Sequence, residues 1–247
     1  MHGALLIDLT GKRAFVTGGG RGIGRATALL LARAGAKVSI GYRARKPAAE
    51  THIVAAVRGD LGTASGAQKA VAETLRALGG SLDILVINHG VWPPDGVPVA
   101  DMSDEQWEST RRANLDAVMY VCRAAIPGIV TGGTIVLVSS TAGQRGEAFH
   151  TDYAATKGAV IAITKSLAVE LAPRITVNCV APGWVDTEMA AKPYAGEGRQ
   201  RIEQTIPLGR VASAEDIAGP IVFLCSPLAR HITGEILNVN GGSVLCG

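Results

Sequence analysis

Short apolar runs alternate with stretches of helical periodicity along the whole chain, and this alternation limits the fold more than any other feature. Two of the runs, Ile84–Ile87 and Thr134–Val138, are almost entirely apolar, as strands buried on both faces of a sheet must be. Strands that alternate with helices favour a parallel sheet covered by helices on both faces. We therefore predict an α/β protein with a doubly wound parallel sheet of about seven strands.

The expected elements follow one another without a linker, repeat or low-complexity tract, so we expect residues 1–247 to form one domain. Candidate strands cover residues 13–17, 37–42, 53–58, 83–88, 133–139, 175–181 and 236–239. Candidate helices cover residues 22–34, 44–51, 64–78, 104–126, 152–171, 198–205 and 214–225. The candidate at 44–51 has to be short or irregular, because only about ten residues join the strands around it and Pro47 lies among them.

A glycine-rich segment follows the first expected strand and precedes the first expected helix. It reads Thr17-Gly18-Gly19-Gly20-Arg21-Gly22-Ile23-Gly24, which differs in spacing from the strict G-x-G-x-x-G pattern. Free N–H groups at a helix start and the helix dipole attract a pyrophosphate, and glycines let the backbone approach it closely. The segment indicates a dinucleotide-binding turn, with a plain loop as the alternative.

Three residues of one stretch indicate proton chemistry. Tyr153 stands thirteen residues after Ser140, and Lys157 follows four residues later. Four residues make about one helical turn, so Tyr153 and Lys157 share a helix face. An ammonium group beside a phenol favours the phenolate, so we expect Lys157 to lower the pKa of Tyr153 and make it a tunable proton donor. For the Tyr–Lys pair alone, an ordinary amphipathic helix is the alternative.

Taken together, the motifs resemble those of the short-chain dehydrogenase/reductase family over essentially the whole chain and in the family's order. They are Thr17-Gly18-x-x-x-Gly22-x-Gly24, Asp60-Leu61, Asn88-His89-Gly90, Asn114, Ser140, Tyr153-x-x-x-Lys157 and Pro182-Gly183 followed by Thr187. Within the family, the chain looks most like the bacterial 3-oxoacyl-(acyl-carrier-protein) reductases and related ketoreductases. The resemblance implies a Rossmann-type fold and an NAD(P)-dependent oxidoreductase that reduces a ketone or 3-oxoacyl group to an alcohol.

The resemblance implies four catalytic residues. Ser140 and Tyr153 bind the carbonyl oxygen, and Tyr153 donates the proton as the alkoxide forms. Lys157 tunes the phenol and holds the nicotinamide ribose, while Asn114 holds a water that links Lys157 to solvent. The family's spacing of thirteen residues before the tyrosine selects Ser140 over the adjacent Ser139.

The resemblance also implies the contacts to the cofactor. Asp60 accepts a hydrogen bond from the adenine amino group, Leu61 packs on the adenine, and Asn88 and Gly90 line the adenosine ribose. His89 replaces the family's usual alanine, and we interpret it as a packing change. The full set implied to bind the cofactor is Thr17, Gly18, Arg21, Gly22, Ile23, Gly24, Tyr42, Arg43, Asp60, Leu61, Asn88, Gly90, Tyr153, Lys157, Pro182, Gly183, Val185 and Thr187.

The residues after the second expected strand favour NADP(H) over NAD(H). NAD-binding proteins of this fold hold the ribose 2′-hydroxyl with an acidic residue there, yet no acid occurs between Asp8 and Glu50. Arg21 and Arg43 can meet a 2′-phosphate, because a guanidinium donates two hydrogen bonds to it. Arg45 or Lys46 would assist; the alternative is that all are solvated surface bases.

The sequence constrains the substrate less than it constrains the cofactor. The uncharged segment 125–133 lacks the basic patch with which carrier-protein reductases meet an acidic carrier, although Arg174 remains. We expect residues 141–151 with Trp92 and Trp184 to wall the substrate site, and residues 188–206 to form a lid. A small ketone, a polyol-like sugar and a 3-oxoacyl thioester stay open. The alternatives are an NAD-dependent alcohol or polyol dehydrogenase working oxidatively and, further off, a non-catalytic dinucleotide-binding protein.

The composition argues against several other classes of protein. A net charge of +3 is too small to argue for nucleic acid, and no run of 18 apolar residues argues for a membrane span. Four scattered cysteines without a C-x-x-C pair indicate neither a metal site nor a disulfide framework. With no signal-peptide pattern at the start, we expect a cytoplasmic protein. The resemblance implies a homotetramer.

Overall fold

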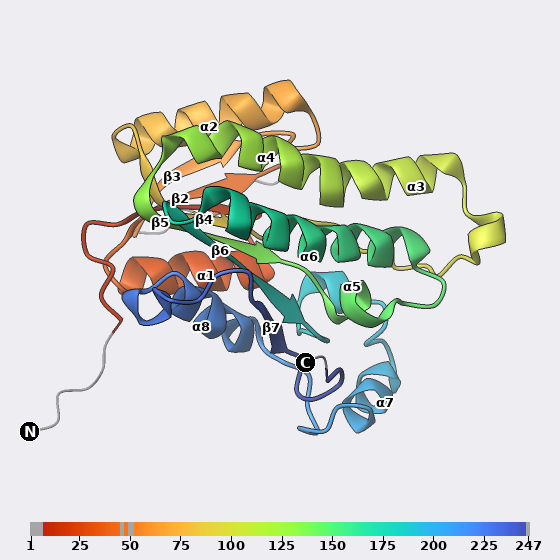
Figure 1. Cartoon of the computed structure of the whole chain (residues 1–247). Coiled ribbons are helices and arrows are strands. Elements are labelled where there is room, and N and C mark those ends of the chain that lie inside the picture. The colour runs from red at the N-terminus through yellow and green to blue at the C-terminus, as the bar shows by residue number, and fades with distance from the viewer. Residues whose placement is uncertain (1–6, 45–46, 49–51, 246–247) are drawn as a thin grey trace, which may run out of the picture.

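Seven parallel strands form one sheet in the computed structural model, which describes residues 7–44, 47–48 and 52–245. Their order is β3-β2-β1-β4-β5-β6-β7 (Figure 1). The order reverses between β1 and β4, and open sheets of this kind bind ligands beyond the carboxyl ends of their strands at that point. The strands are β1 (Arg13–Thr17), β2 (Lys37–Tyr42), β3 (Ile53–Arg58), β4 (Leu82–Ile87), β5 (Ile129–Val138), β6 (Ile175–Pro182) and β7 (Ile236–Val239).

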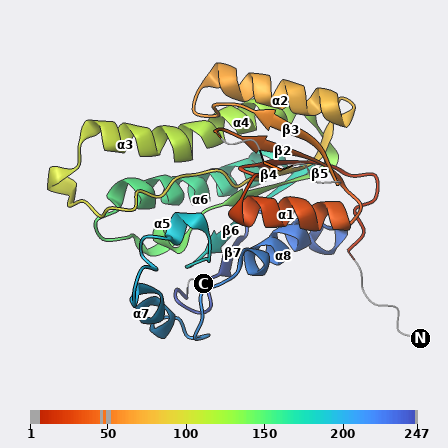
Figure 2. The same ribbon diagram turned by 180° about the vertical axis from the view of Figure 1, so that it is seen from behind.

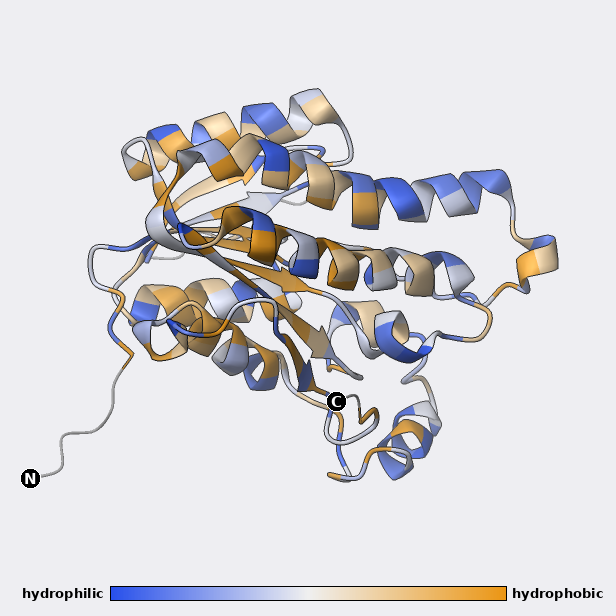
Figure 3. Ribbon diagram, viewed as in Figure 1, coloured by the Kyte–Doolittle hydropathy of each residue, from blue (hydrophilic) through white to orange (hydrophobic). Residues whose placement is uncertain are grey.

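Helices cover both faces of the sheet, as Figures 1 and 2 show from opposite sides. One layer holds α1 (Gly22–Arg33) and α8 (Ala214–Leu224), and the other holds α2 (Ala64–Leu78), α4 (Ala117–Ala125) and α6 (Thr151–Leu171). Neighbouring residues of β1 point to different layers, since Val16 packs with α1 and α8 whereas Phe15 packs with the other three helices. Both are fully buried. Two buried faces explain the nearly continuous apolar runs, which stand out in the hydropathy colouring of Figure 3.

Small polar residues start several helices. Thr63 caps α2 by accepting a hydrogen bond from Gly66 N at 3.1 Å. Ser213 and Asp216 form a reciprocal capping box on α8. Each such cap contributes about 1 kcal/mol by satisfying an otherwise unpaired N–H group. The remaining elements are α3 (Asp104–Arg111), α5 (Thr141–Arg145), α7 (Gly198–Gln204), the 3₁₀ turns η1 (Val99–Asp101), η3 (Ile126–Gly128), η4 (Glu188–Ala190) and η5 (Pro227–Ala229), and the π-helical turn η2 (Arg112–Asp116).

The predicted α/β class and seven-stranded parallel sheet are confirmed, with four local corrections. The helix expected at 104–126 is a succession of α3, η2 and α4. The strand expected at 133–139 begins earlier, at Ile129. Gly132, with φ of 81°, interrupts the apolar sequence pattern of this strand, but the pairing with β4 extends to Ile129. The short helix α5 was not expected. Ala44, Pro47 and Ala48 are not helical, and the rest of the candidate helix at 44–51 lies outside the described residues.

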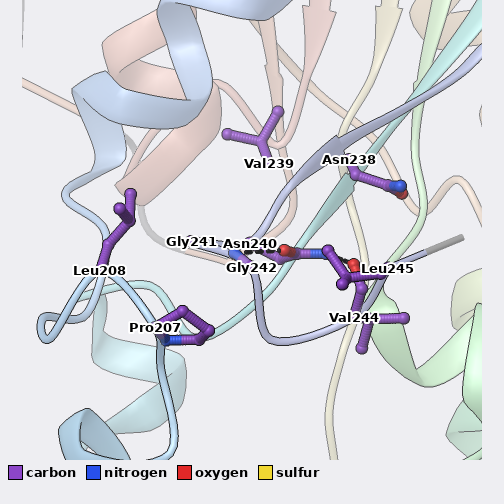
Figure 4. A pocket seen from close by; sticks show the side chains of 9 residues that line it. All are labelled: Pro207, Leu208, Asn238, Val239, Asn240, Gly241, Gly242, Val244 and Leu245. Carbon is purple, nitrogen blue, oxygen red and sulfur yellow. Dashed lines mark hydrogen bonds between the residues drawn. The ribbon is translucent and has the colours of Figure 1, made fainter.

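A shallow cavity of about 760 Å³ lies beyond the end of β7 (Figure 4). Asn240 organises its floor, since its side-chain amide donates to Val244 O at 2.9 Å. Leu245 stands at its edge and is 90% exposed. Cys122, Cys179 and Cys225 are buried and form no disulfide, while Cys246 lies outside the described part. Over the described ranges, no helix has the length and apolarity that crossing a membrane requires.

Candidate active site

The carboxyl ends of β1, β4, β5 and β6 open into a cavity of about 1110 Å³. The topology brings these strand ends to one edge of the sheet, although they are far apart in the sequence. Thr17, Gly24 and Asn114 are the predicted site residues that do not line this cavity. Those that do are Gly18, Arg21, Gly22, Ile23, Tyr42, Arg43, Asp60, Leu61, Asn88, Gly90, Ser140, Tyr153, Lys157, Pro182, Gly183, Val185 and Thr187.

The glycine-rich turn after β1 is shaped by close backbone contacts. Gly22 has a φ of 50°, in the left-handed region that favours glycine. A Cβ atom on Gly24 would lie 2.3 Å from the carbonyl oxygen of Gly18 and 2.5 Å from Nδ2 of Asn88. Only glycine therefore lets α1 start this close to β1. Gly24 holds the turn together, while Gly18 and Gly22 line the cavity.

Thr17 and Asn88 fasten the turn to β4. The backbone N–H of Asn88 donates to Thr17 Oγ1 at 3.1 Å, and its side-chain amide donates to the carbonyl oxygens of Thr17 and Gly18 at 3.3 and 3.4 Å. His89 Nδ1 lies 2.8 Å from Thr17 Oγ1. Burial, assisted by the charge of Lys157, lowers the pKa of His89 to about 3. His89 is thus a neutral packing residue, as interpreted from the sequence.

Ser140, Tyr153 and Lys157 converge at the inner end of the cavity. Ser140 is the N-cap of α5, and its Oγ accepts from Ala142 N at 3.1 Å. Tyr153 and Lys157 are one turn apart on α6, with Nζ 5.8 Å from the centre of the phenol ring. Lys157 Nζ donates to Val138 O at 2.9 Å. The arrangement puts a hydroxyl, a phenol and an amine around one end of the cavity.

The neighbouring Ser139 has a different task. Its hydroxyl is buried and donates to the backbone oxygen of Lys157 at 2.8 Å, which ties β5 to α6. Both serines border the cavity, but the hydroxyl of Ser140 is the one that interacts with the phenol of Tyr153. This geometry agrees with the choice of Ser140 made from spacing.

Burial dominates the pKa values at this end of the cavity. It raises the pKa of Tyr153 to about 12, against an opposing hydrogen bond with Ser140, and the charge of Glu147 adds to the rise. Burial also lowers the pKa of Lys157 to about 8. The expected lowering of the phenol pKa by Lys157 is therefore wrong for the protein alone, because desolvation disfavours the charged form of each group.

Asn114 lies behind Lys157, in the π-helical turn η2, and is completely buried. Its Oδ1 accepts from Val91 N at 2.8 Å, and its Nδ2 donates to Val91 O at 2.9 Å and to Thr156 Oγ1 at 3.3 Å. A Cβ atom on Gly90 would lie 3.2 Å from Asn114 Oδ1 and 3.4 Å from Lys157 Nζ. Both side chains therefore meet at Gly90. A π-helical turn inside a helix is often found at a functional site.

Two ion pairs lie at the outer end of the cavity. Asp60, expected at the adenine, accepts from Gly62 N at 3.1 Å and pairs with Arg112 at 2.6 Å. Arg21, expected at the 2′-phosphate, pairs with Glu188 of the expected lid at 2.7 Å. Both pairs are exposed, so each contributes about 0–1 kcal/mol and can exchange partners at little cost. Arg45 and Lys46 lie outside the described residues.

Sequence reasoning missed the part that Arg112 plays beside Asp60. Its position two residues before Asn114 on the same expected helix was the signal that could have found it. Glu147 was expected in the wall of the substrate site, without a role. It lines the cavity, together with Trp92 and Trp184. Within the described ranges, no group of three or more His, Cys, Asp or Glu side chains is arranged to hold a metal ion.

A doubly wound sheet with this Ser–Tyr–Lys arrangement defines an oxidoreductase of the short-chain dehydrogenase/reductase class, and comparison with known proteins agrees. The family model described as Enoyl-(Acyl carrier protein) reductase matches residues 18–243. The 3-oxoacyl-(acyl-carrier-protein) reductase FabG of Aquifex aeolicus (strain VF5) is 40% identical over 248 residues, which cover 96% of this chain and 98% of that protein. The chain thus belongs to the short-chain dehydrogenase/reductase family, whose members bind a nicotinamide dinucleotide, and within it to the FabG-like reductases.

Solved structures match with the same completeness. The short-chain dehydrogenase/reductase "Glucose/ribitol dehydrogenase" from Brucella melitensis has a TM-score of 0.89 at 32% identity, covering 98% of this chain and all of that one. A blue fluorescent protein from a metagenomic library, solved in complex with NADPH, has a TM-score of 0.87 at 33% identity, covering 96% of this chain and 100% of that one. The predicted single-domain Rossmann-type fold is confirmed.

Proposed function

We propose that this chain is an NADPH-dependent carbonyl reductase, which converts a ketone or 3-oxoacyl group to an alcohol. The observation that carries the proposal is the meeting of Ser140, Tyr153 and Lys157 at one end of a cavity whose other part is bordered by the glycine-rich turn. A dinucleotide fits these residues. The turn brings unhindered backbone and the start of α1 to the cavity, and Gly90 leaves room for a ligand beside the amine of Lys157.

In the proposed mechanism, Ser140 and the phenol of Tyr153 hydrogen-bond the carbonyl oxygen and orient it. The cofactor, when bound, supplies the hydride to the carbonyl carbon and a positively charged ring after transfer. Tyr153 then gives its proton to the forming alkoxide, so that an alcohol and a phenolate result. Lys157 stabilises the phenolate and holds the nicotinamide ribose.

We assign Asn114 to the proton relay that restores Tyr153. The oxygen and the nitrogen of its side-chain amide are both hydrogen-bonded to the backbone of Val91, so the side chain cannot turn toward substrate. A water held beside Asn114 would connect Lys157 to solvent. The remaining cofactor contacts are proposed as the sequence suggested them, with Asp60 and Leu61 at the adenine, Asn88 and Gly90 at the ribose, and, flanking the nicotinamide, Pro182, Gly183, Val185 and Thr187.

The preference for NADP(H) is supported by Arg21 and Arg43, which line the cavity next to Tyr42. The NADPH-bound neighbour favours the same choice. Arg21 would leave Glu188 for a 2′-phosphate, and because that pair is exposed the exchange costs little. The lid proposed at 188–206 starts at this pair.

The test is steady-state oxidation of NADPH with an acetoacetyl thioester and, in parallel, with plain ketones and aldehydes, repeated with NADH. We expect turnover with NADPH at a kcat/KM at least about tenfold above that with NADH, since a bidentate phosphate contact is lost with NADH. The Tyr153→Phe variant should lose turnover and keep NADPH binding, measured by fluorescence titration. Undiminished turnover in that variant, or a preference for NADH, would reject the corresponding assignment.

A second candidate is a polyol dehydrogenase that works in the oxidative direction with NAD. The observation that favours it is the printed name of the Brucella melitensis neighbour, Glucose/ribitol dehydrogenase. Reduction of NAD by sugar alcohols, faster than any NADPH-dependent ketone reduction, would establish it instead. An acyl carrier protein stays a possible partner only if the thioester is the faster substrate, because the segment 125–133 carries no charge. Self-association to a homotetramer and a cytoplasmic location are also proposed.

A further inference from the structure

Glu147 is a carboxylate in the wall of the cavity, between α5 and α6, and the proposed mechanism does not use it. Its side chain is only 21% exposed. It lies near enough to Tyr153 for its charge to raise the pKa of the phenol. The wall of the cavity therefore holds a half-buried carboxylate close to the proposed proton donor.

The backbone two residues after Glu147 has a strained conformation. Phe149 has a φ of 66° and is the one non-glycine residue of the described chain in the left-handed region. Its carbonyl oxygen accepts from Val97 N at 2.8 Å, and His150 N donates to Glu147 O at 3.2 Å. Strain of this kind persists where the surrounding structure over-determines a conformation, and it clusters at functional sites.

Trp92 and His150 lie beside the Glu147 carboxylate. Burial raises the pKa of this carboxyl group, and His150, Trp92 and Arg145 oppose the rise. The Trp92 ring stacks on His150 with centroids 4.6 Å apart. His150 Nδ1 lies 3.2 Å from Ala148 O but 3.9 Å from Glu147 Oε1, so it is directed to the backbone. A carboxylate can accept about four hydrogen bonds, and this side chain lines the cavity, so a bound molecule can supply donors to it.

We propose that Glu147 accepts a hydrogen bond from a hydroxyl group of the substrate, so that neutral hydroxylated ketones and aldehydes are the preferred substrates. This inference rests on the proposed carbonyl reductase function. A substrate hydroxyl supplies the donor that a half-buried carboxylate needs, whereas an apolar acyl chain would desolvate it without compensation. His150 and Arg145 are the neighbouring groups whose charge acts on Glu147. His150 is directed to the backbone of Ala148, and Arg145 is exposed, so that its charge is screened by water.

The test compares 1-hydroxybutan-2-one with butan-2-one, which differ by one hydroxyl group. We expect wild-type kcat/KM to favour the hydroxyketone by about ten- to hundredfold, the range for a hydrogen bond to a charged group. Glu147→Gln keeps nearly the same side-chain shape but removes the negative charge and replaces one acceptor oxygen with an NH₂ donor. The preference should then fall to within about threefold, mainly through a higher KM for the hydroxyketone. Glu108→Gln, an exposed carboxylate of α3 outside the cavity, should keep the full preference.

Two further measurements keep the result unambiguous. Trp92→Phe retains an aromatic ring on His150 but removes the indole N–H that helps to keep Glu147 ionised, so it should weaken the preference through KM even where Glu147→Gln folds poorly. Binding of butane-1,2-diol and butan-2-ol, followed by ligand-observed NMR, needs no turnover.

A wild-type protein that shows no preference in either rate or binding would overturn the inference, as would a Glu147→Gln variant that keeps the full preference. Equal reduction of both ketones with NADPH leaves the proposed function standing and rejects only the hydroxyl site. Stronger binding of the diol that depends on Glu147, with no ketone reduced, supports the site and rejects the proposed function.

Discussion

At the scale of single residues, burial sets the chemistry of Tyr153 and Lys157. The phenolate and the ammonium are both charged forms, and both are disfavoured in the interior of the protein. This is why the pKa of Tyr153 rises to about 12 while that of Lys157 falls to about 8. The phenol of Tyr153 is thus a proton donor that stays protonated, and the amine of Lys157 is the group that titrates nearer to neutrality.

The two pKa values predict the pH dependence of reduction. As pH rises through about 8, Lys157 loses the proton that lets it stabilise a phenolate, while Tyr153 keeps its own proton until about pH 12. We expect kcat/KM for NADPH-dependent reduction, which reports the free enzyme, to fall above pH 8. Lys157→Arg should have lower activity and no such fall, because a guanidinium does not titrate there. A flat wild-type profile between pH 7 and 10 would contradict this assignment.

At the scale of elements, the turn between β1 and α1 depends on close approaches at two of its glycines. A Cβ atom on Gly19 would lie 2.6 Å from Cβ of Ile40. Gly24 has no room for a side chain, because the Gly18 carbonyl oxygen is too near, whereas a Cβ atom on Gly20 would meet nothing closer than 3.6 Å. The turn is therefore rigid at its helix end and tolerant at its outer end. The sequence pattern identified the turn, but it could not tell which glycine serves packing and which lines the cavity.

We expect Gly24→Ala to lower the free energy of unfolding by about 1–3 kcal/mol, since the overlap forces the backbone to shift. NADPH affinity should fall with it. Gly20→Ala in the same turn is the matched control and should change the stability by less than about 0.5 kcal/mol. Urea unfolding followed by circular dichroism measures both. Equal stabilities for the two variants would mean that the turn relaxes freely.

The limits of sequence reasoning also appear at this scale. The strands of the sheet, which is buried on both faces, were identified from apolar runs, and their order along the chain is confirmed. The π-helical turn at Asn114 was missed, because the sequence of a helix does not show whether its backbone hydrogen bonds span five residues or four. The early start of β5 was missed because Gly132 and Gly133 hide the pairing of Ile129 with Leu82.

At the scale of the whole molecule, apolar side chains remain on the surface of the helical layer that carries α4 and α6. Met119 of α4 is 42% exposed and Val169 of α6 is 82% exposed. Leu245, near the end of the described chain, is 90% exposed. Surfaces of this kind are often covered by another copy of the chain.

We predict a homotetramer of about 100 kDa, four times the 25.4 kDa of the chain, in multi-angle light scattering. Val169→Glu should shift the protein to smaller species, because a charge would be buried at the contact. Val54→Glu, which changes a 52% exposed residue of the edge strand β3, should leave the assembly intact. A monomeric wild-type protein would reject the prediction.

The amino-acid order alone was enough for the alternating elements, the parallel sheet and the residue types of the site, because local periodicity and motif spacing depend on near neighbours in the chain. It could not predict the direction of the Tyr153 pKa shift, the Asp60–Arg112 pair or the stacking of Trp92 on His150 beside Glu147. Burial and contacts between distant segments produce these features. They exist only once the strand ends meet at one edge of the sheet and the distant segments around the cavity come together.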